Sequence, residues 1–118
     1  MNLKELSQAY YIKREIEHYK QELSQLRDHD CAKEEIEAQI ELRKNQLVEE
    51  HARIIRYINS IPNSVTRQVF YHRFINNESW TKVAHSIGGG NTSASVKKIC
   101  YRYLQRQGKD AGDKENDY

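Results

Sequence analysis

The apolar positions of residues 3–27 recur every three or four residues, which is the period of one face of an α-helix. Successive members lie 3, 3, 4, 3, 4 and 3 residues apart, close to the heptad seam of a coiled coil. They are Leu6, Ala9, Ile12, Ile16, Tyr19, Leu23 and Leu26. The pattern predicts one long helix, which ends where Asp28, His29 and Asp30 interrupt it and offer caps for a second helix.

A second apolar stripe extends from about residue 31 to residue 60, with a gap at Arg43 and Lys44. Its members are Ile36, Ile40, Leu47, Ile54, Ile58 and Ile61. Long helices joined by a short polar turn form an antiparallel hairpin or half of a larger coiled coil. Because one hairpin leaves the far side of each stripe uncovered, we expect a third helix or a second subunit to cover it. These N-terminal helices are therefore a candidate homodimer contact.

The chain then changes from long stripes to short elements. Pro62 ends the second helix, because proline restricts the residue before it. Asn63 or Ser64 can then cap a third helix over about 65–75. The next turn is predicted at 76–78, because asparagine tolerates left-handed geometry best among non-glycine residues. The residues expected to point inward are Val65, Val69 or Phe70, and Phe74. In the first helix, one ring of the pair Tyr10 and Tyr11 is expected inward and the other at the rim.

Ser79 to Leu104 is predicted to form two short helices joined by three glycines. Ser79 is a good N-cap, and glycine at 88–90 can adopt positive φ, so the chain turns there. The apolar face of the first helix is Trp80, Val83, Ala84 and Ile87. Asn91 or Thr92 then caps a second helix over 92–106, whose inner stripe is Val96, Ile99, Cys100, Tyr103 and Leu104.

The opposite face of helix 92–106 is small, polar and basic. It carries Ala94, Ser95, Lys98, Tyr101, Arg102 and Gln105, with Lys97 at its edge. A support helix, a glycine turn and a second helix with such a face are typical of a helix-turn-helix that places its second helix in the DNA major groove.

The distribution of charge agrees with that interpretation, although the chain as a whole carries only +2. Residues 1–60 hold 10 Lys/Arg and 12 Asp/Glu, residues 61–107 hold 7 and 1, and residues 108–118 hold 2 and 4. Positive charge therefore coincides with the predicted helix-turn-helix, as binding to a phosphate backbone requires. We expect an all-α protein with a helical hairpin at 1–60, a DNA-binding unit at 61–107 and a disordered tail at 108–118.

Composition argues against several other classes of protein. No apolar run approaches the roughly 20 residues that span a bilayer, and the N-terminus lacks the apolar core of a signal peptide, so we expect a cytoplasmic protein without membrane contact. Cys31 and Cys100 fit no metal-ligand pattern and are expected to be free thiols. We expect no cofactor, no metal and no enzymatic activity, because no catalytic set occurs at usable spacing and the glycine run lacks the lysine and the strand of a P-loop.

Residues 61–104 resemble region 4 of bacterial sigma factors. The resemblance is carried by Arg67, Val69, Arg73-Phe74, Ser79-Trp80, Val83-Ala84, Ile87-Gly88 and Val96. The stretch SWTKVAHSIGGGNTSASVKKICYRYL is still more similar to small phage-encoded sigma-like regulators of the RinA and ArpU type, in which a helical extension precedes the motif. The turn between Gly88 and Val96 is longer than in sigma region 4, and no segment resembles the sigma region that melts promoters. The resemblance implies a phage-derived transcriptional regulator that binds double-stranded DNA and could contact RNA polymerase.

The predicted contacts follow from chemistry and position on helix 92–106. Lys97, Lys98 and Arg102 would meet phosphates or guanine edges. Ser93, Ser95 and Tyr101 are candidates for base or sugar contacts, and Asn91 and Thr92 lie at the helix start, which suits a phosphate. Arg67, Arg73 and Lys82 would hold the DNA backbone on either side.

Two other functions remain open at this point. A small terminase subunit, which packages phage DNA, also joins a helix-turn-helix to coiled-coil oligomerisation but forms a ring. A coiled-coil adaptor would bind a partner helix and would not bind DNA at low salt.

Overall fold

The computed structural model describes residues 1–27 and 30–110, and within those ranges every regular element is helical. In chain order these elements are α1 (Leu3–Ser24), α2 (Ala32–Asn59), α3 (Ser64–Phe70), the π-helical turn η1 (Tyr71–Ile75), α4 (Trp80–Ile87) and α5 (Ser93–Asp110). The all-α prediction is confirmed for this part of the chain. The predicted tail lies outside the described residues from 111 onward, whereas 108–110 continue α5.

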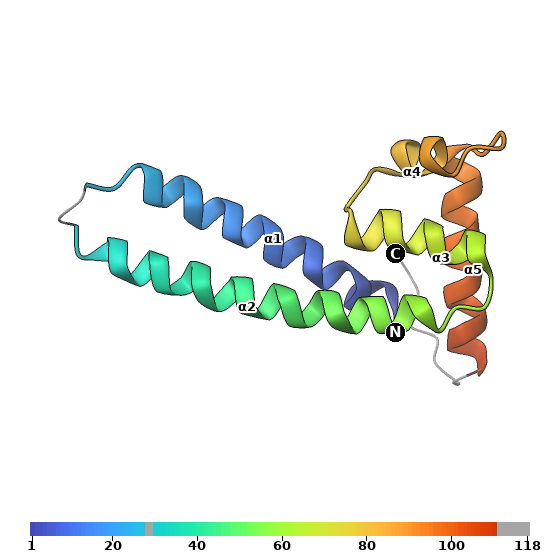
Figure 1. Ribbon diagram of the computed structural model, residues 1–118, viewed down its shortest axis with the longest axis horizontal. Helices are drawn as coiled ribbons and strands as arrows, with labels where there is room; N and C mark the ends of the chain where they lie inside the picture. Colours follow the sequence, from blue (N-terminus) through green and yellow to red (C-terminus); the bar gives the residue numbers. More distant parts are fainter. Residues whose placement is uncertain (28–29, 111–118) are drawn as a thin grey trace.

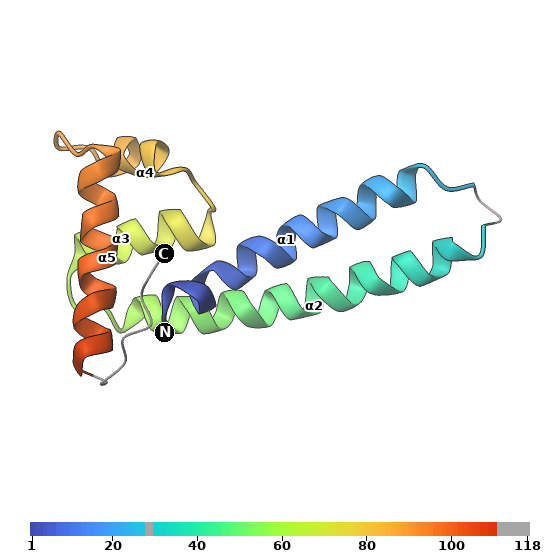
Figure 2. The same ribbon diagram turned by 180° about the vertical axis from the view of Figure 1, so that it is seen from behind.

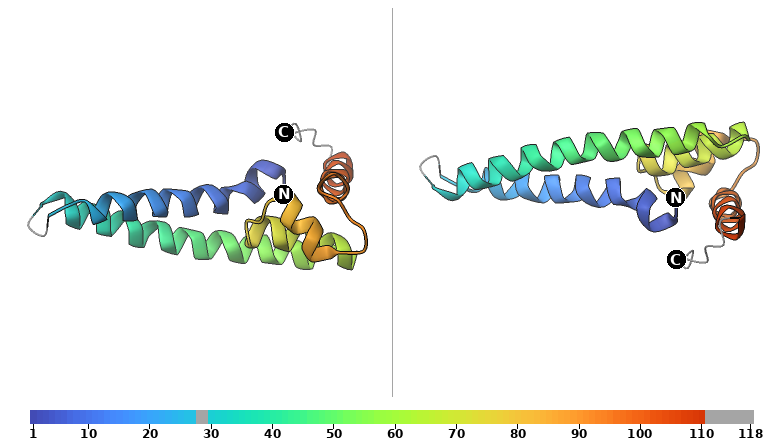
Figure 3. Two further views of the ribbon diagram at one scale, coloured as in Figure 1. Left: turned by 90° about the horizontal axis from the view of Figure 1, so that it is seen from above. Right: turned by 90° about the horizontal axis from the view of Figure 1, so that it is seen from below.

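Helices α1 and α2 lie side by side and antiparallel as a long arm, shown in blue and green in Figures 1 and 3. The molecule measures 53 × 33 × 23 Å, and the arm accounts for its long axis. Ile12, Ile16, Ile36 and Ile40 form a buried cluster between the two helices, so the predicted stripes do face each other. The first turn of α1 is closed by a capping box in which Asn2 and Glu5 bond each other's backbone N–H.

The gap in the second stripe has an electrostatic explanation. Nε of Arg43 on α2 lies 3.3 Å from Oε2 of Glu15 on α1, so an ion pair bridges the helices where an apolar contact is missing. Both side chains are partly exposed, and such a pair adds little stability compared with apolar burial. The arm is therefore held mainly by the isoleucine cluster.

At its other end the arm meets the C-terminal helices (Figure 2). The larger core lies at this junction and joins the two parts. Leu6 and Ala9 of α1 are fully buried there, together with Ile54 of α2. The C-terminal elements contribute Val69, Phe70, Phe74, Val83, Ala84, Val96, Cys100 and Leu104 to the same cluster. The core thus crosses the boundary predicted at residue 60. We call α3, η1, α4 and α5, together with the ends of α1 and α2 that pack against them, the head.

The start of the third helix differs from its prediction. Val65 was expected to point inward but is 42% exposed, and Thr66 is buried in its place. The reason is geometric, because both Val69 and Phe70 are buried. At 100° per residue, the face of α3 that holds both of them also holds Thr66 and leaves Val65 at its edge. Asn63 caps the helix by accepting hydrogen bonds from the N–H and the hydroxyl of Thr66, so the buried hydroxyl has a partner.

The predicted helix 65–75 is also not one regular helix. After Phe70 it widens into η1, and the N–H of Asn76 donates to the carbonyl of Tyr71 five residues earlier. Such π turns are rare and often occur at functional sites. This turn places Phe74 in the core and Arg73 beside it at the surface of the head.

Candidate nucleic-acid interface

The turn between α4 and α5 is built as the three glycines predict. Gly88, Gly89 and Gly90 have φ values of 73°, 63° and 79°, a region that L side chains rarely adopt. At the other end of α4 the hydroxyl of Ser79 accepts from the N–H of Lys82, and Asn77 takes the left-handed conformation expected for an asparagine of that turn. Local sequence therefore fixes both ends of α4.

A reciprocal cap starts α5. The hydroxyl of Thr92 accepts from the N–H of Ser95 at 3.1 Å, and the hydroxyl of Ser95 accepts from the N–H of Thr92 at 2.8 Å. Asn91 accepts a further bond from the hydroxyl of Ser95 and donates to the carbonyl of Gly88. The polar groups of these three predicted contact residues are thus engaged in holding the start of the helix.

The two faces of α5 divide as the sequence indicates. Val96, Cys100 and Leu104 are buried against α3 and α4, and Ile99 and Tyr103 are partly buried against the same core. Ser93, which lies seven residues before Cys100 and so on the same side of the helix, is exposed at its first residue. Lys97, Lys98 and Arg102 are exposed on the other side. A shallow hollow on that side is lined by Thr92, Ala94, Ser95, Lys98, Ile99 and Arg102. The structure therefore brings four predicted contact residues (Thr92, Ser95, Lys98 and Arg102) to one place.

Tyr101 does not point freely outward from α5 but joins a row of cations and aromatic rings. Nζ of Lys97 lies 5.7 Å from the centre of its ring, and the ring of Trp80 meets it edge-on at 6.1 Å. The guanidinium of Arg73 lies at the other end of the row, with Cζ 4.5 Å from the centre of the Trp80 ring. We call Lys97, Tyr101, Trp80 and Arg73 the cation–aromatic row; it links the edge of α5 to η1.

The only acidic residue of 61–107 lies partly withdrawn from the surface. The side chain of Glu78 is 13% exposed, with Oε1 at 3.2 Å from Nδ1 of His72 and accepting from the hydroxyl of Ser86. Its backbone carbonyl accepts from Nη1 of Arg73 at 3.0 Å. The turn before α4 therefore orients Arg73 while it shields the one negative charge of residues 61–107.

The other two predicted cations lie apart from this row. Nη1 of Arg67 donates to the carbonyls of Ile61 and Pro62 at 2.7 and 3.0 Å, which ties α3 to the end of α2. Lys82 is exposed on α4. Arg67 thus has a structural role in the turn, whereas Lys82 presents its charge to solvent.

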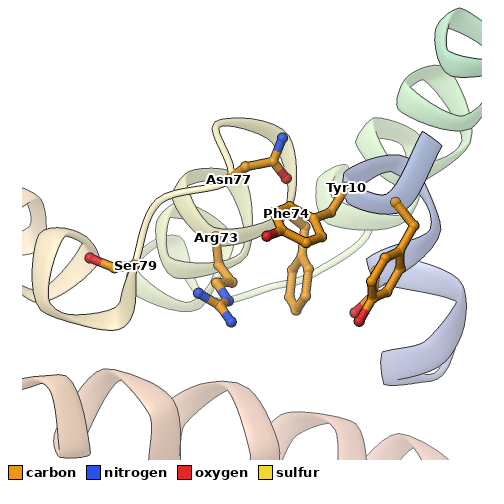
Figure 4. Close-up of a pocket in the computed structure, with 7 residues that line it drawn as sticks. Tyr10, Arg73, Phe74, Asn77 and Ser79 are labelled. Atoms are coloured by element: carbon orange, nitrogen blue, oxygen red, sulfur yellow. The ribbon is translucent and has the colours of Figure 1, made fainter. Parts of the chain in front are cut away.

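Sequence reasoning did not find a cleft where α1 meets η1. It has a volume of about 360 Å³ and is lined by Ser7, Tyr10 and Tyr11 from α1 and by Arg73, Phe74, Asn77 and Ser79 from the η1–α4 segment. Figure 4 shows Tyr10 reaching from α1 towards Arg73 and Phe74. The prediction that one of the two tyrosines points inward is wrong, because Tyr10 is 39% and Tyr11 62% exposed. The only signal for this cleft in the sequence was the pair of adjacent tyrosines at 10 and 11.

Burial raises the pKa of two groups on α5, Cys100 on its inner side and Tyr101 in the cation–aromatic row. It raises the pKa of the Cys100 thiol to about 12, against which the nearby charge of Arg73 acts only weakly. Burial also raises the pKa of Tyr101, so its hydroxyl keeps its proton and can donate a hydrogen bond. Neither Cys31 nor Cys100 is in a disulfide, which confirms the expectation of free thiols.

Within the described ranges, no helix has the length and apolar content needed to cross a bilayer. The same ranges hold no cluster of three or more potential metal-binding side chains of the His, Cys, Asp and Glu types. Comparison of the chain with protein-family models, with curated proteins and with solved structures finds no significant match.

Proposed function

We propose that this protein is a sequence-specific DNA-binding transcriptional regulator of the sigma-region-4-like, phage-encoded type. On this proposal, α4, the glycine turn and α5 form a helix-turn-helix, and α5 enters the major groove. The observation that carries the proposal is the exposed cationic face of α5 opposite a fully packed inner face. Lys98 and Arg102 are exposed beside the same hollow, where either can reach a phosphate or a guanine edge.

The cation–aromatic row and the withdrawn Glu78 also support the proposal. They leave the surface around α5 positive, which favours a polyanion and raises its rate of association. A regulator acts on transcription either by contacting a partner protein or by binding at a particular position in a promoter. RNA polymerase is the partner that the sigma-like resemblance suggests. The arm leaves the head on the side away from α5 and is free to make such a contact (Figure 1).

The test combines selection of bound sequences from random DNA with a double variant, Lys98→Ala with Arg102→Ala. We expect the selection to return a defined motif and the variant to lose most of its affinity. The slope of log affinity against log salt should fall by about 0.9 for each lost phosphate contact. Lys44→Ala, which removes an exposed charge of the arm, is the control. Unchanged affinity and salt dependence in the double variant would refute the proposal.

A DNA-packaging role of the small-terminase kind is a second candidate, favoured by the exposed Leu42 and Val48 on α2 of the arm. Apolar side chains on a projecting arm are suited to contacts between copies. Light scattering separates the two functions, because a regulator should be a monomer or dimer, whereas a packaging protein should form a ring of many copies. Absence of DNA binding at low salt would instead select the adaptor function.

A further inference from the structure

The division of charge in the folded molecule does not follow the boundary between hairpin and head. The outer part of the arm, residues 15–50, holds 5 Lys/Arg and 11 Asp/Glu. The base of the arm, residues 1–14 and 51–60, holds 5 Lys/Arg and only Glu5 against them. Glu5 is itself paired, with Oε2 at 2.9 Å from Nη2 of Arg53. Together with residues 61–107, the base makes up a part of the fold with 12 Lys/Arg and 2 Asp/Glu, which we call the cationic part.

The cleft between α1 and η1 is lined only by residues of this cationic part. On its α1 side, Nη1 of Arg14 donates to the hydroxyl of Tyr10 at 3.3 Å, and Cζ of Arg14 lies 5.7 Å from the centre of the ring. The rings of Tyr10 and Tyr11 meet edge-on with centres 5.3 Å apart. These contacts present two phenol groups and a guanidinium together at the rim of the cleft.

Arg73 connects the cleft to α5, because it lines the cleft and also ends the cation–aromatic row. Its hydrogen bond to the carbonyl of Glu78 uses one of five guanidinium N–H donors, so the group is oriented and can still donate to an anion. An unbroken series of cationic and aromatic side chains therefore leads from Lys97 on α5 to Tyr10 on α1.

We propose that the cleft is a second DNA contact. In it Arg73 and the hydroxyls of Tyr10 and Tyr11, together with Arg14 beside Tyr10, hold phosphates of the duplex flanking the site of α5. Arginine and tyrosine are common donors to phosphate oxygens, and a flat phenol ring also packs against deoxyribose. The acidic outer arm is repelled by the same backbone and projects away from it. This inference rests on the proposed function, since it extends the DNA surface from α5 to the base of the arm.

The test uses the full chain and a random-sequence duplex of about 30 base pairs, long enough to reach beyond α5. A photoreactive benzophenone amino acid replaces Tyr11 in one variant and His18, an exposed residue further along the same helix, in the other. We expect position 11 to cross-link to DNA and position 18 not to. In parallel, Arg14→Gln should weaken binding about three- to tenfold at low salt and lower the salt slope by about 0.9.

Lys20→Gln is the matched control for Arg14→Gln, because it removes one exposed cation from the acidic part of the same helix. Arg73 is left unchanged, since its contacts with Glu78 and Trp80 support the turn before α4. If position 11 gives no cross-link, or if Arg14→Gln binds as tightly as Lys20→Gln, the cleft is not a DNA contact. If the Lys98 and Arg102 double variant still loses affinity in that case, the proposed function stands without it. A wild-type protein that binds no duplex would refute both.

Discussion

Cys100 illustrates how the position of a residue on α5 determines its chemistry. It lies in the inner stripe between Val96 and Leu104, and its side chain is fully buried. Burial disfavours the thiolate, which is the form that reacts with electrophiles and binds metals. Cys100 therefore acts as a small apolar residue of the core, and the sequence pattern that placed it inward also predicted that property.

We expect Cys31 to react with iodoacetamide in the folded protein at about pH 8 and Cys100 to resist it. Cys31 is exposed at the start of α2, whereas burial holds the pKa of Cys100 at about 12 and keeps the reagent away. Peptide mapping by mass spectrometry after partial labelling measures both rates, and labelling in urea is the control. Comparable rates at the two sites in native buffer would mean that α5 does not pack as described.

At the scale of elements, the three α-helices after residue 60 each begin with their own cap. Asn63, Ser79 and Thr92 each accept a hydrogen bond from a backbone N–H in the first turn. Isolated helices as short as α3 and α4 are marginal in water, so these two depend on their caps and on the shared core. The cap of the longer α5 fixes where that helix begins. The cap of α5 also positions the face that we propose enters the groove.

We expect Thr92→Ala to lower the free energy of unfolding by about 1 kcal/mol, because the N–H of Ser95 loses its acceptor. Ser93→Ala is the matched control; it removes an exposed hydroxyl one residue further along and should have little effect. Urea denaturation followed by circular dichroism measures both variants. Equal stability of Thr92→Ala and wild type would show that the hydroxyl of Thr92 adds nothing to the start of the helix.

The elements that sequence predicted well are those whose signal is local. Ser79 as a cap, positive φ at the three glycines and the inner stripe of α5 follow from residue type and spacing alone. The burial of Thr66 instead of Val65 does not follow from the local sequence. It depends on the packing of Phe70 beside Phe74 in the shared core. The π turn that ends the third helix is likewise set by packing, since nothing in YHRFI distinguishes it from an ordinary helical turn.

At the scale of the whole molecule, the candidate site could be predicted only in part. Lys98 and Arg102 were found from their place on one helix, but the cleft requires α1 to lie beside η1 across more than 60 residues of chain. The charge of the head also depends on this arrangement, because residues 1–14 join the cationic side only after folding. Long-range packing is therefore what would extend the proposed DNA contact from α5 to the base of the arm.

The same packing predicts that the head cannot fold without the start of α1. Leu6 is fully buried in a cluster with Ile54 and Phe70, so Leu6→Ala removes apolar contacts and leaves a cavity at the junction of arm and head. We expect it to lower the free energy of unfolding by about 2–5 kcal/mol. The loss should appear in the near-ultraviolet signal of Trp80, which lies in the head far from the substituted residue in sequence.

Leu23→Ala is the matched control for this prediction, because Leu23 is on the same helix but only partly buried, against the outer isoleucine cluster. It should destabilise the protein less and leave the Trp80 signal of the native state unchanged. If Leu6→Ala instead melts the far-ultraviolet signal of the arm in a first transition and the Trp80 signal in a later one, the arm and head are independent units. A single shared transition, with a midpoint lowered far more by Leu6→Ala than by Leu23→Ala, means that the arm and the head unfold together and that the arm supports the position of α5.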